Sequence, residues 1–277
     1  MRVHLLASTA APFVAAAPTL AALSFVATFL AVATPAAPAF ALDADGVKKV
    51  LQTIDDRQRN TGDHKSLVYI QTKEKNREDV VMEAVVYRRD ASDQFMILLL
   101  KPKAERGKGY LKIDKNLWMY DPTVGRWDRR TERERIAGSD SRRADFDESR
   151  LAEEYTAEYK GEEKLGKFAV HHIKLTEKPG ADVPYPVTEL WVDKETNNVL
   201  KRQDVAASGK LMRTVYTPKW KKIFSESKKE DVWYPAEIRI YDEVEKDNST
   251  IVLIQEVDLR PLQENIFTKA WLESKSR

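Results

Sequence analysis

The sequence has 277 residues, with 46 Lys and Arg, 44 Asp and Glu, and no Cys. A formal net charge of +2 gives the chain no global field that would attract nucleic acid or an anionic membrane, so neither partner is expected. Without Cys, disulfide bonds and thiolate metal sites are excluded. The charged fraction of 32% is mixed in sign, which indicates a solvated exterior around one sizeable core.

The first forty residues differ in kind from the rest. Arg2 is the only acidic or basic side chain before Asp43, and a long run rich in Ala, Val, Leu and Phe follows it. The run ends on the small-x-small pattern Ala39-Phe40-Ala41, which is typical of a signal peptidase site. We therefore expect residues 1–41 to be a cleaved signal peptide and residues 42–277 to be a single exported domain.

A transmembrane anchor is the alternative interpretation of the same segment. Four prolines interrupt it, however, and no stop-transfer pattern follows Ala41. Later in the chain, the longest apolar run is Phe95–Leu100, far short of the ~18 residues that a membrane span requires. The chain is not expected to be an integral membrane protein after cleavage.

The exported part begins with a helical pattern and then changes to alternation. Residues 42–60 carry Val47, Val50, Leu51 and Ile54 at helical spacing, which predicts one amphipathic helix. Period-two patterns follow and predict a series of strands joined by tight turns.

The first strands are expected at residues 66–73, 78–89 and 93–101, the last of which is apolar on both faces and should be covered on both sides. Two short strands and a third one follow in the aromatic stretch from Gly109 to Trp127.

Residues 131–159 break this rhythm. They are charged and compatible with a helix, so we expect a loop and a short helix that cross one face of the sheet. Strands then resume at hairpin spacing, and a short helical turn packed by Phe267 and Leu272 closes the chain. About ten or eleven strands in antiparallel order predict a large curved sheet or an open barrel, whose apolar face can enclose a cavity.

The residues do not assemble a catalytic or metal-binding motif. His171 and His172 are adjacent and alternate on a strand, so they are expected at or near the surface and cannot easily share a metal. GxSxG, SxxK and phosphate-binding glycine motifs are missing from the sequence. We therefore expect no enzyme, no cofactor and no metal.

The densest basic cluster lies in and beside residues 131–159 and is interleaved with acids. It is interpreted as surface charge, with contact to an anionic headgroup at a cavity mouth as the alternative. Its members are Arg129, Arg130, Arg133, Arg135, Arg142 and Arg143.

Three stretches resemble the LolA-like family of periplasmic outer membrane lipoprotein-sorting proteins. The first is KGYLKIDKNLWMYDPTVGRWDRR at residues 108–130, and the second is ELWVDKETNNVLKRQDVAASGKLMRTVY at residues 189–216. The third, residues 233–274, is similar to the terminal hairpin and closing helix of that family. Together with the signal peptide and first helix, the resemblance covers nearly all of the exported chain.

The resemblance implies an incomplete antiparallel β-barrel, covered by the N-terminal helix and by a lid at residues 131–159. It implies a periplasmic carrier that binds lipid or lipoprotein acyl chains in an apolar cavity for sorting to the outer membrane. An inner-membrane exporter complex is a further partner that it allows. The alternative is a lipid-sensing regulatory or envelope-assembly module that binds a protein partner.

The apolar faces of the alternating strands supply the candidate ligand-binding residues. For each of them, packing in the core against a helix is the competing interpretation. The candidate cavity wall consists of Met82, Val86, Leu111, Ile113, Met119, Trp191, Ile238, Ile240 and Leu253.

Overall fold

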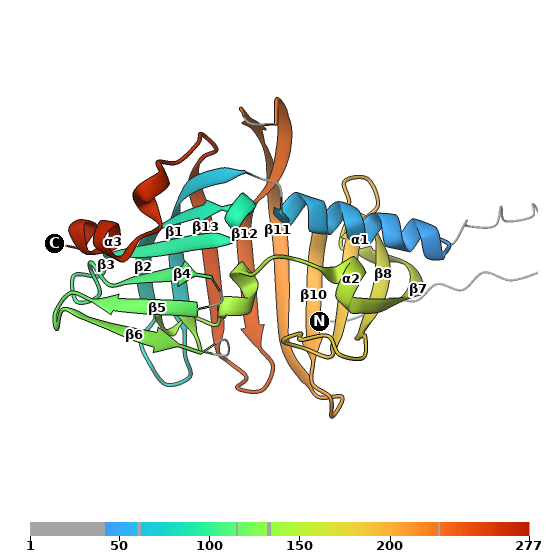
Figure 1. Cartoon of the computed structure of the whole chain (residues 1–277). Coiled ribbons are helices and arrows are strands. Elements are labelled where there is room, and N and C mark those ends of the chain that lie inside the picture. Colours follow the sequence, from blue (N-terminus) through green and yellow to red (C-terminus); the bar gives the residue numbers. More distant parts are fainter. Residues whose placement is uncertain (1–41, 60–61, 115, 132–133, 227, 277) are drawn as a thin grey trace, which may run out of the picture. The chain divides into compact units, whose positions relative to one another are not determined.

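The computed structural model describes residues 42–59, 62–114, 116–131, 134–226 and 228–276. The expected signal peptide therefore lies outside the described residues, as do Asn60, Lys115 and Arg133. Thirteen strands form one antiparallel sheet in the order β6-β5-β4-β3-β2-β1-β13-β12-β11-β10-β9-β8-β7, which is open between β6 and β7 (Figure 1).

The strands are β1 (Asp63–Lys73), β2 (Val80–Arg89), β3 (Gln94–Lys101), β4 (Gly109–Ile113), β5 (Asn116–Asp121), β6 (Arg126–Arg130), β7 (Tyr155–Leu165), β8 (Phe168–Glu177), β9 (Val187–Asp193), β10 (Val199–Val205), β11 (Leu211–Ser225), β12 (Glu230–Asp242) and β13 (Ser249–Asp258). The helices are α1 (Ala44–Arg59), α2 (Leu151–Glu154) and α3 (Lys269–Lys275), with 3₁₀ turns η1 (Asp90–Ser92), η2 (Ile136–Gly138), η3 (Arg143–Phe146) and η4 (Glu264–Ile266). Among the described residues, none of these helices is both long and apolar enough to span a bilayer.

The expected open antiparallel sheet is confirmed, but its details differ from the prediction. The described residues form thirteen strands rather than ten or eleven. The largest difference lies in β11 and β12, which pair with each other as far as Ser225 and Glu230. Lysines and Pro218 obscure the alternation of apolar and polar residues in this part of the chain. The hairpin does not need a regular apolar face there, because the hydrogen bonds between its two strands hold it.

The sheet has two faces, which we call inner and outer. Val68, Ile70, Met82 and Ala84 mark the inner face, and the register carries that face through Ile240 on β12 to Leu190 on β9. Two apolar clusters lie on it. The lid-side cluster is centred on β1–β5, β12 and β13, and the helix-side cluster on β8 and β9.

Helix α1 covers the helix-side cluster. Val47, Val50, Leu51 and Ile54 are all at least nine-tenths buried and pack against Ile173, Leu175, Leu190 and Val192. This confirms both the helix and the face that the sequence pattern assigned to it. The described residues of α1 end at Arg59, so only the expected last residue lies outside them.

The outer face is covered at one end by the closing helices. Leu272 of α3 is 0% exposed, and Phe267 packs beside it, as expected. Their partners include Met96, Leu98 and Leu111. Strand β3 is therefore buried on both sides, with Phe95, Ile97 and Leu99 on the inner face. The sequence pattern predicted this double burial correctly.

The sheet ends in two edge strands of unequal length. Strand β6 has five residues, whereas β7 has eleven. The pairing of β7 with β8 is interrupted at Gly161, which adopts a φ of +121°. That conformation is open to glycine and strained for other residues.

Candidate functional site

The lid-side cluster is covered by a segment of irregular structure, residues 134–154, which we call the lid. It contains η2, η3 and the single turn α2, so the expected loop and short helix are present. It ends five residues earlier than expected, because β7 already begins at Tyr155. Figure 1 shows this segment running across the sheet between β6 and β7.

Few apolar side chains of the lid touch the sheet. Ile136, which is 3% exposed, belongs to the lid-side cluster, and Ala137 and Phe146 pack against it. The ring of Phe146 lies 5.0 Å from that of Phe95, with an angle of 31° between the planes. These contacts place the lid directly on the apolar part of the inner face.

Polar contacts fasten the lid at both ends of this apolar patch. The amide of Ala137 donates to the hydroxyl of Tyr110 at 3.0 Å. Thr250 donates to the carboxylate of Asp140 at 2.9 Å and accepts from its amide at 2.8 Å. At the far end, the Asp55 carboxylate of α1 accepts from the Leu151 and Ala152 amides at 2.9 Å each.

Two ion pairs fasten the middle of the lid. The Arg213 guanidinium on β11 donates to both oxygens of Asp145, at 2.9 and 2.5 Å. The Lys112 ammonium on β4 lies 2.7 Å from Asp147. Two residues along the chain place Asp145 and Asp147 at most about 7 Å apart, yet β4 and β11 are six strands apart. The sheet must therefore bend around the lid.

Arg213 belongs to a buried group that we call the polar belt, formed by Arg202, Asp204 and Arg213. Asp204 is 0% exposed and accepts from both arginines, through their Nε atoms at 2.6 Å each. The belt lies on β10 and β11, between the lid-side and helix-side clusters. It therefore divides the inner face into two apolar halves.

The charges of this group are stabilised by one another. Burial opposes ionisation of Asp145, but Arg213 holds the pKa of that carboxyl below its usual value. Burial alone would lower the pKa of Arg213, but Asp145 and Asp204 raise it well above its usual value. Each group therefore favours the charged form of the other.

The closed lid leaves little space beneath it at the belt. A void of about 10 Å³ lies between Arg135 and Arg142 of the lid and Arg213 and Ile240 of the sheet. A space of this size holds about one water molecule. A ligand of any greater size can reach this part of the inner face only if the lid moves.

The nine candidate wall residues do not lie on one face. Five lie on the inner face in or beside the lid-side cluster: Met82, Val86, Met119, Ile238 and Ile240. The other four lie on the outer face: Leu111 and Ile113 beneath α3, Trp191 in a small cluster with Val170 and Leu200, and Leu253, which is 37% exposed.

The division of these nine residues has a simple cause. Alternation along a strand separates its two faces but does not identify which face is inner, and β4 is buried on both of its faces. Residues on opposite faces cannot line a single cavity, so a cavity on the inner face could include only five of the nine. Phe95 and Ile97 also lie on the inner face. The sequence pattern would have allowed their prediction, but they are not among the nine candidate wall residues.

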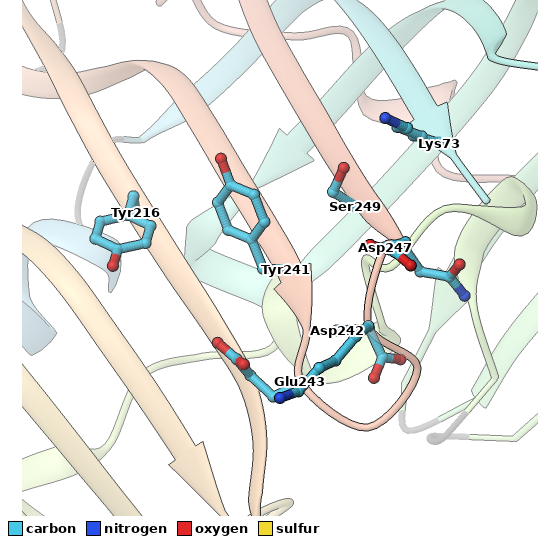
Figure 2. Close-up of a pocket in the computed structure, with 9 residues that line it drawn as sticks. Lys73, Tyr216, Tyr241, Asp242, Glu243, Asp247 and Ser249 are labelled. Atoms are coloured by element: carbon cyan, nitrogen blue, oxygen red, sulfur yellow. The ribbon is translucent and has the colours of Figure 1, made fainter. Parts of the chain in front are cut away.

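A larger cavity, of about 610 Å³, lies where β11, β12 and β13 reach the β12–β13 turn (Figure 2). Tyr216 and Tyr241 form one side of it, with ring centres 5.9 Å apart. Lys73, Asp242, Glu243, Asp247 and Ser249 are among its other lining residues. Its polar walls do not suit an acyl chain, so this cavity is not the expected apolar one.

The histidines are more buried than expected. His171 is 7% exposed, and its Nδ1 lies 3.0 Å from the hydroxyl of Tyr159. His172 stacks on Trp191 and lies 2.7 Å from each of two carboxylates, Glu163 and Glu189. The expectation of a residue at or near the surface was wrong for His171, which is buried, whereas His172 is partly exposed. Within the described part of the chain, no group of three or more His, Asp or Glu side chains is arranged to hold a metal ion.

The basic cluster is likewise only partly at the surface. Arg143 is 6% exposed, and Arg135 pairs with Asp140 of the lid. Arg142 lies over the ring of Tyr185 at 6.0 Å. The sequence did not identify Arg213, the residue that binds the lid most closely, because it lies far along the chain in an ordinary strand pattern.

Comparison with known proteins agrees with this architecture. The model of a family described as uncharacterized matches residues 91–274. A domain from Vibrio parahaemolyticus, described as an outer membrane lipoprotein-sorting protein domain, is 18% identical with a TM-score of 0.70 and covers 82% of this chain and 97% of its own. No curated protein matches the sequence.

Two further solved structures are similar. A LolA superfamily protein from Nitrosomonas europaea is 20% identical with a TM-score of 0.65, over 81% of this chain and 98% of that one. A DUF1329 family protein from Desulfovibrio piger is 16% identical with a TM-score of 0.70, over 82% and 98%. At these identities the likeness shows the fold. The family match over more than half of the sequence shows that the chain belongs to that uncharacterized family, and the solved structures show that its fold is LolA-like.

Proposed function

We propose that the chain is a periplasmic carrier that holds the acyl chains of a lipid or lipoprotein on the inner face, beneath the lid, for sorting to the outer membrane. The LolA-like fold supports the proposal, since one similar structure is described as a lipoprotein-sorting domain. The signal-like pattern of residues 1–41 supports export. The cargo is held without a covalent step, so the proposal assigns no catalytic residue.

The observation that carries the proposal is the character of the lid. Over the lid-side cluster its apolar contact is small, through Ile136, Ala137 and Phe146, whereas its polar contacts are many. When the lid moves away, water can replace many of its hydrogen bonds at modest cost. The apolar contact is the part that an acyl chain can replace, at about 0.8 kcal/mol for each buried CH₂.

Loading is then an exchange of one apolar layer for another. The lid and the acyl chain compete for the same inner-face residues, among them Met82, Phe95 and Ile238. A ligand shifts the equilibrium between the closed and the open lid only by the difference between its affinities for these two states. Because the closed lid leaves almost no space at the belt, that difference in affinity is large.

Native mass spectrometry of the mature chain tests the proposal directly. We expect lipid to copurify, and a fluorescent fatty acid to bind saturably. If the folded protein contains no lipid and also fails to bind the fatty acid at saturation, the carrier function is contradicted.

Two neighbouring residues of β13 provide a matched pair of variants. Val252 packs against the lid-side cluster, whereas Leu253 faces outward and is 37% exposed. Val252→Gln places an amide in the proposed acyl site and should weaken fatty-acid binding by about tenfold or more, since burying an unpaired amide costs roughly 1–3 kcal/mol. Leu253→Gln should leave binding unchanged.

The polar outer cavity favours a second candidate, a module that binds a protein partner and senses lipid. Its lining includes Lys73 and Lys246 together with Asp242 and Asp247, so it offers both signs of charge to a polar partner. Capture of a defined membrane-protein complex by the mature chain, together with no lipid uptake, would favour this candidate over the carrier.

A further inference from the structure

The lid presents one carboxylate to a buried arginine. Asp145 accepts from Nη1 and Nη2 of Arg213, the two-pronged geometry with which a guanidinium binds a carboxylate or phosphate. The third nitrogen of the Arg213 guanidinium, Nε, already donates to Asp204. The side chain of Arg213 is 5% exposed, whereas that of Asp145 is 24% exposed. The arginine is thus fixed in the sheet, and the carboxylate reaches it from above.

An apolar group stands next to this carboxylate. Phe146 directly follows Asp145 and packs against Phe95 and the lid-side cluster. Its carbonyl accepts a hydrogen bond from Arg88. The dipeptide Asp145-Phe146 therefore presents to the inner face an anionic head and an adjoining apolar body, which are the two parts of an anionic amphiphile.

Removal of the lid takes an anionic partner away from Arg213. Asp204 keeps its bonds to Arg202 and Arg213, and Asp242 of β12, the register partner of Arg213, stays beside it, but the two-pronged contact with Asp145 is lost. On the other side, Lys112 retains Asp93 at 2.5 Å when Asp147 departs. The open anion position is thus located at Arg213, which is the point where the apolar lid-side cluster meets the belt.

We propose that Arg213 is a head-group site for an anionic single-chain amphiphile, and that Asp145-Phe146 of the lid occupies the place of this ligand when the lid is closed. The inference rests on the proposed carrier function and adds the class of ligand: an acyl or alkyl chain with a carboxylate or phosphate head. The ligand head replaces Asp145 on Arg213, and its chain replaces Phe146 against Phe95.

A neutral head fits this site poorly. Arg213 is nearly inaccessible to water, and a buried guanidinium without an anionic partner is unfavourable. An amphiphile with a neutral head would displace the lid and leave Nη1 and Nη2 of Arg213 without the anion that Asp145 supplies, with only Nε still bonded to Asp204. The geometry therefore makes charge at the head, rather than chain length alone, the feature that this chain selects.

Displacement of a neutral alkyl-binding fluorophore, N-phenyl-1-naphthylamine, from the mature chain tests the inference. The competitors are palmitate, hexadecyl phosphate and hexadecanol, which share a chain and differ in the head. We expect palmitate or hexadecyl phosphate to bind about tenfold more tightly than hexadecanol, the ratio that a charge-assisted pair supplies. The better of the two identifies a carboxylate or a phosphate as the natural head.

The possible failures are separable. If hexadecanol binds as tightly as both anions, the head-group site is overturned while the carrier function stands. If none of the three compounds binds, the carrier function itself fails. Inorganic phosphate alone should not displace the fluorophore, and displacement by it would overturn the amphiphile in favour of a simple anion site.

Two lid variants separate loosening of the lid from exposure of Arg213. Asp145→Asn loosens the lid and also removes the anion from Arg213, so it should tighten palmitate binding several-fold more than it tightens hexadecanol binding. Asp140→Asn loosens the lid at Thr250 and leaves the Arg213 pair in place, so it should change both affinities alike. Equal effects of the two variants on the palmitate-to-hexadecanol ratio would overturn the proposal.

A third variant, Arg213→Gln, should bring palmitate affinity down to that of hexadecanol. If this variant does not fold, the comparison of Asp145→Asn with Asp140→Asn still decides the question, because both residues lie in the lid rather than in the sheet.

Discussion

The inner face of one sheet carries two covers of different construction. Over β8 and β9, helix α1 inserts Val47, Leu51 and Ile54 into the helix-side cluster, and burial of apolar area holds it. Over β1–β5, the lid contributes few apolar side chains and is held by the ion pairs and hydrogen bonds of Asp140, Asp145 and Asp147.

On the proposed carrier function, one fold combines a permanent layer with a removable one. When a cover leaves, its apolar contacts are lost, whereas many of its polar contacts are exchanged for contacts with water. The polar belt lies between the two apolar clusters, and the two covers meet at Leu151 and Ala152, which the lid contributes to the helix-side cluster and whose amides donate to Asp55 of α1.

The strongest test of this comparison is the removal of apolar volume from the helix. Leu51 is 2% exposed in the helix-side cluster, so Leu51→Ala should lower the free energy of unfolding by about 2–5 kcal/mol. Urea unfolding followed by circular dichroism measures it, with the exposed Gln52→Ala as the control. A loss no larger than that of the control would mean that α1 is not a structural layer.

Acid should weaken the lid-covered half next. Burial on the inner face lowers the pKa of His64 to about 4, and its Nε2 lies 3.0 Å from the hydroxyl of Tyr234. Since the unfolded chain takes up the proton first, this contribution to stability is complete above pH 6.5. It is lost as the pH falls toward 4, by about 3 kcal/mol in all.

Urea unfolding at pH 7 and pH 4.5 measures the effect, and His64→Gln should remove part of the loss between them. Burial also lowers the pKa of His171, on the helix-covered half, so His171→Gln is the matched variant. If the two variants flatten the pH dependence equally, acid does not distinguish the two halves.

The smallest effect is expected from the lid itself. Phe146→Ala removes the main aromatic contact of the lid with Phe95, but the loss cannot exceed the free energy of lid opening. We expect about 1–2 kcal/mol in global unfolding, and faster amide hydrogen exchange confined to residues 134–154. Exchange that accelerates equally in α1 would show that the two covers open as one unit.

The sequence predicted the parts of this architecture that rest on periodicity. Val47, Val50, Leu51 and Ile54 identified α1 and its buried face, and the double burial of β3 followed from its unbroken apolar run. The short closing helix was predicted from Phe267 and Leu272. Local pattern and tertiary packing agree at these positions, so the sequence is enough.

The candidate site was predicted less well, for a physical reason. Leu111 and Trp191 show the same alternation as Met82, but only the final curl of the sheet decides which face the lid covers. Arg213 could not be found in this way, because its importance comes from Asp145, which is sixty-eight positions earlier in the chain. Long-range charge pairs leave no periodic signal.

The unclosed sheet has a consequence for how copies of the chain meet at high concentration. Strand β7 leaves eleven residues at one edge, where another strand could add to the ladder. Glu158, Lys160, Glu162, Glu163 and Lys164 line that edge, and Gly161 interrupts its regular pleat. Charge and a local irregularity thus protect this edge against edge-to-edge aggregation. A closed barrel has no free edge and would not need such protection.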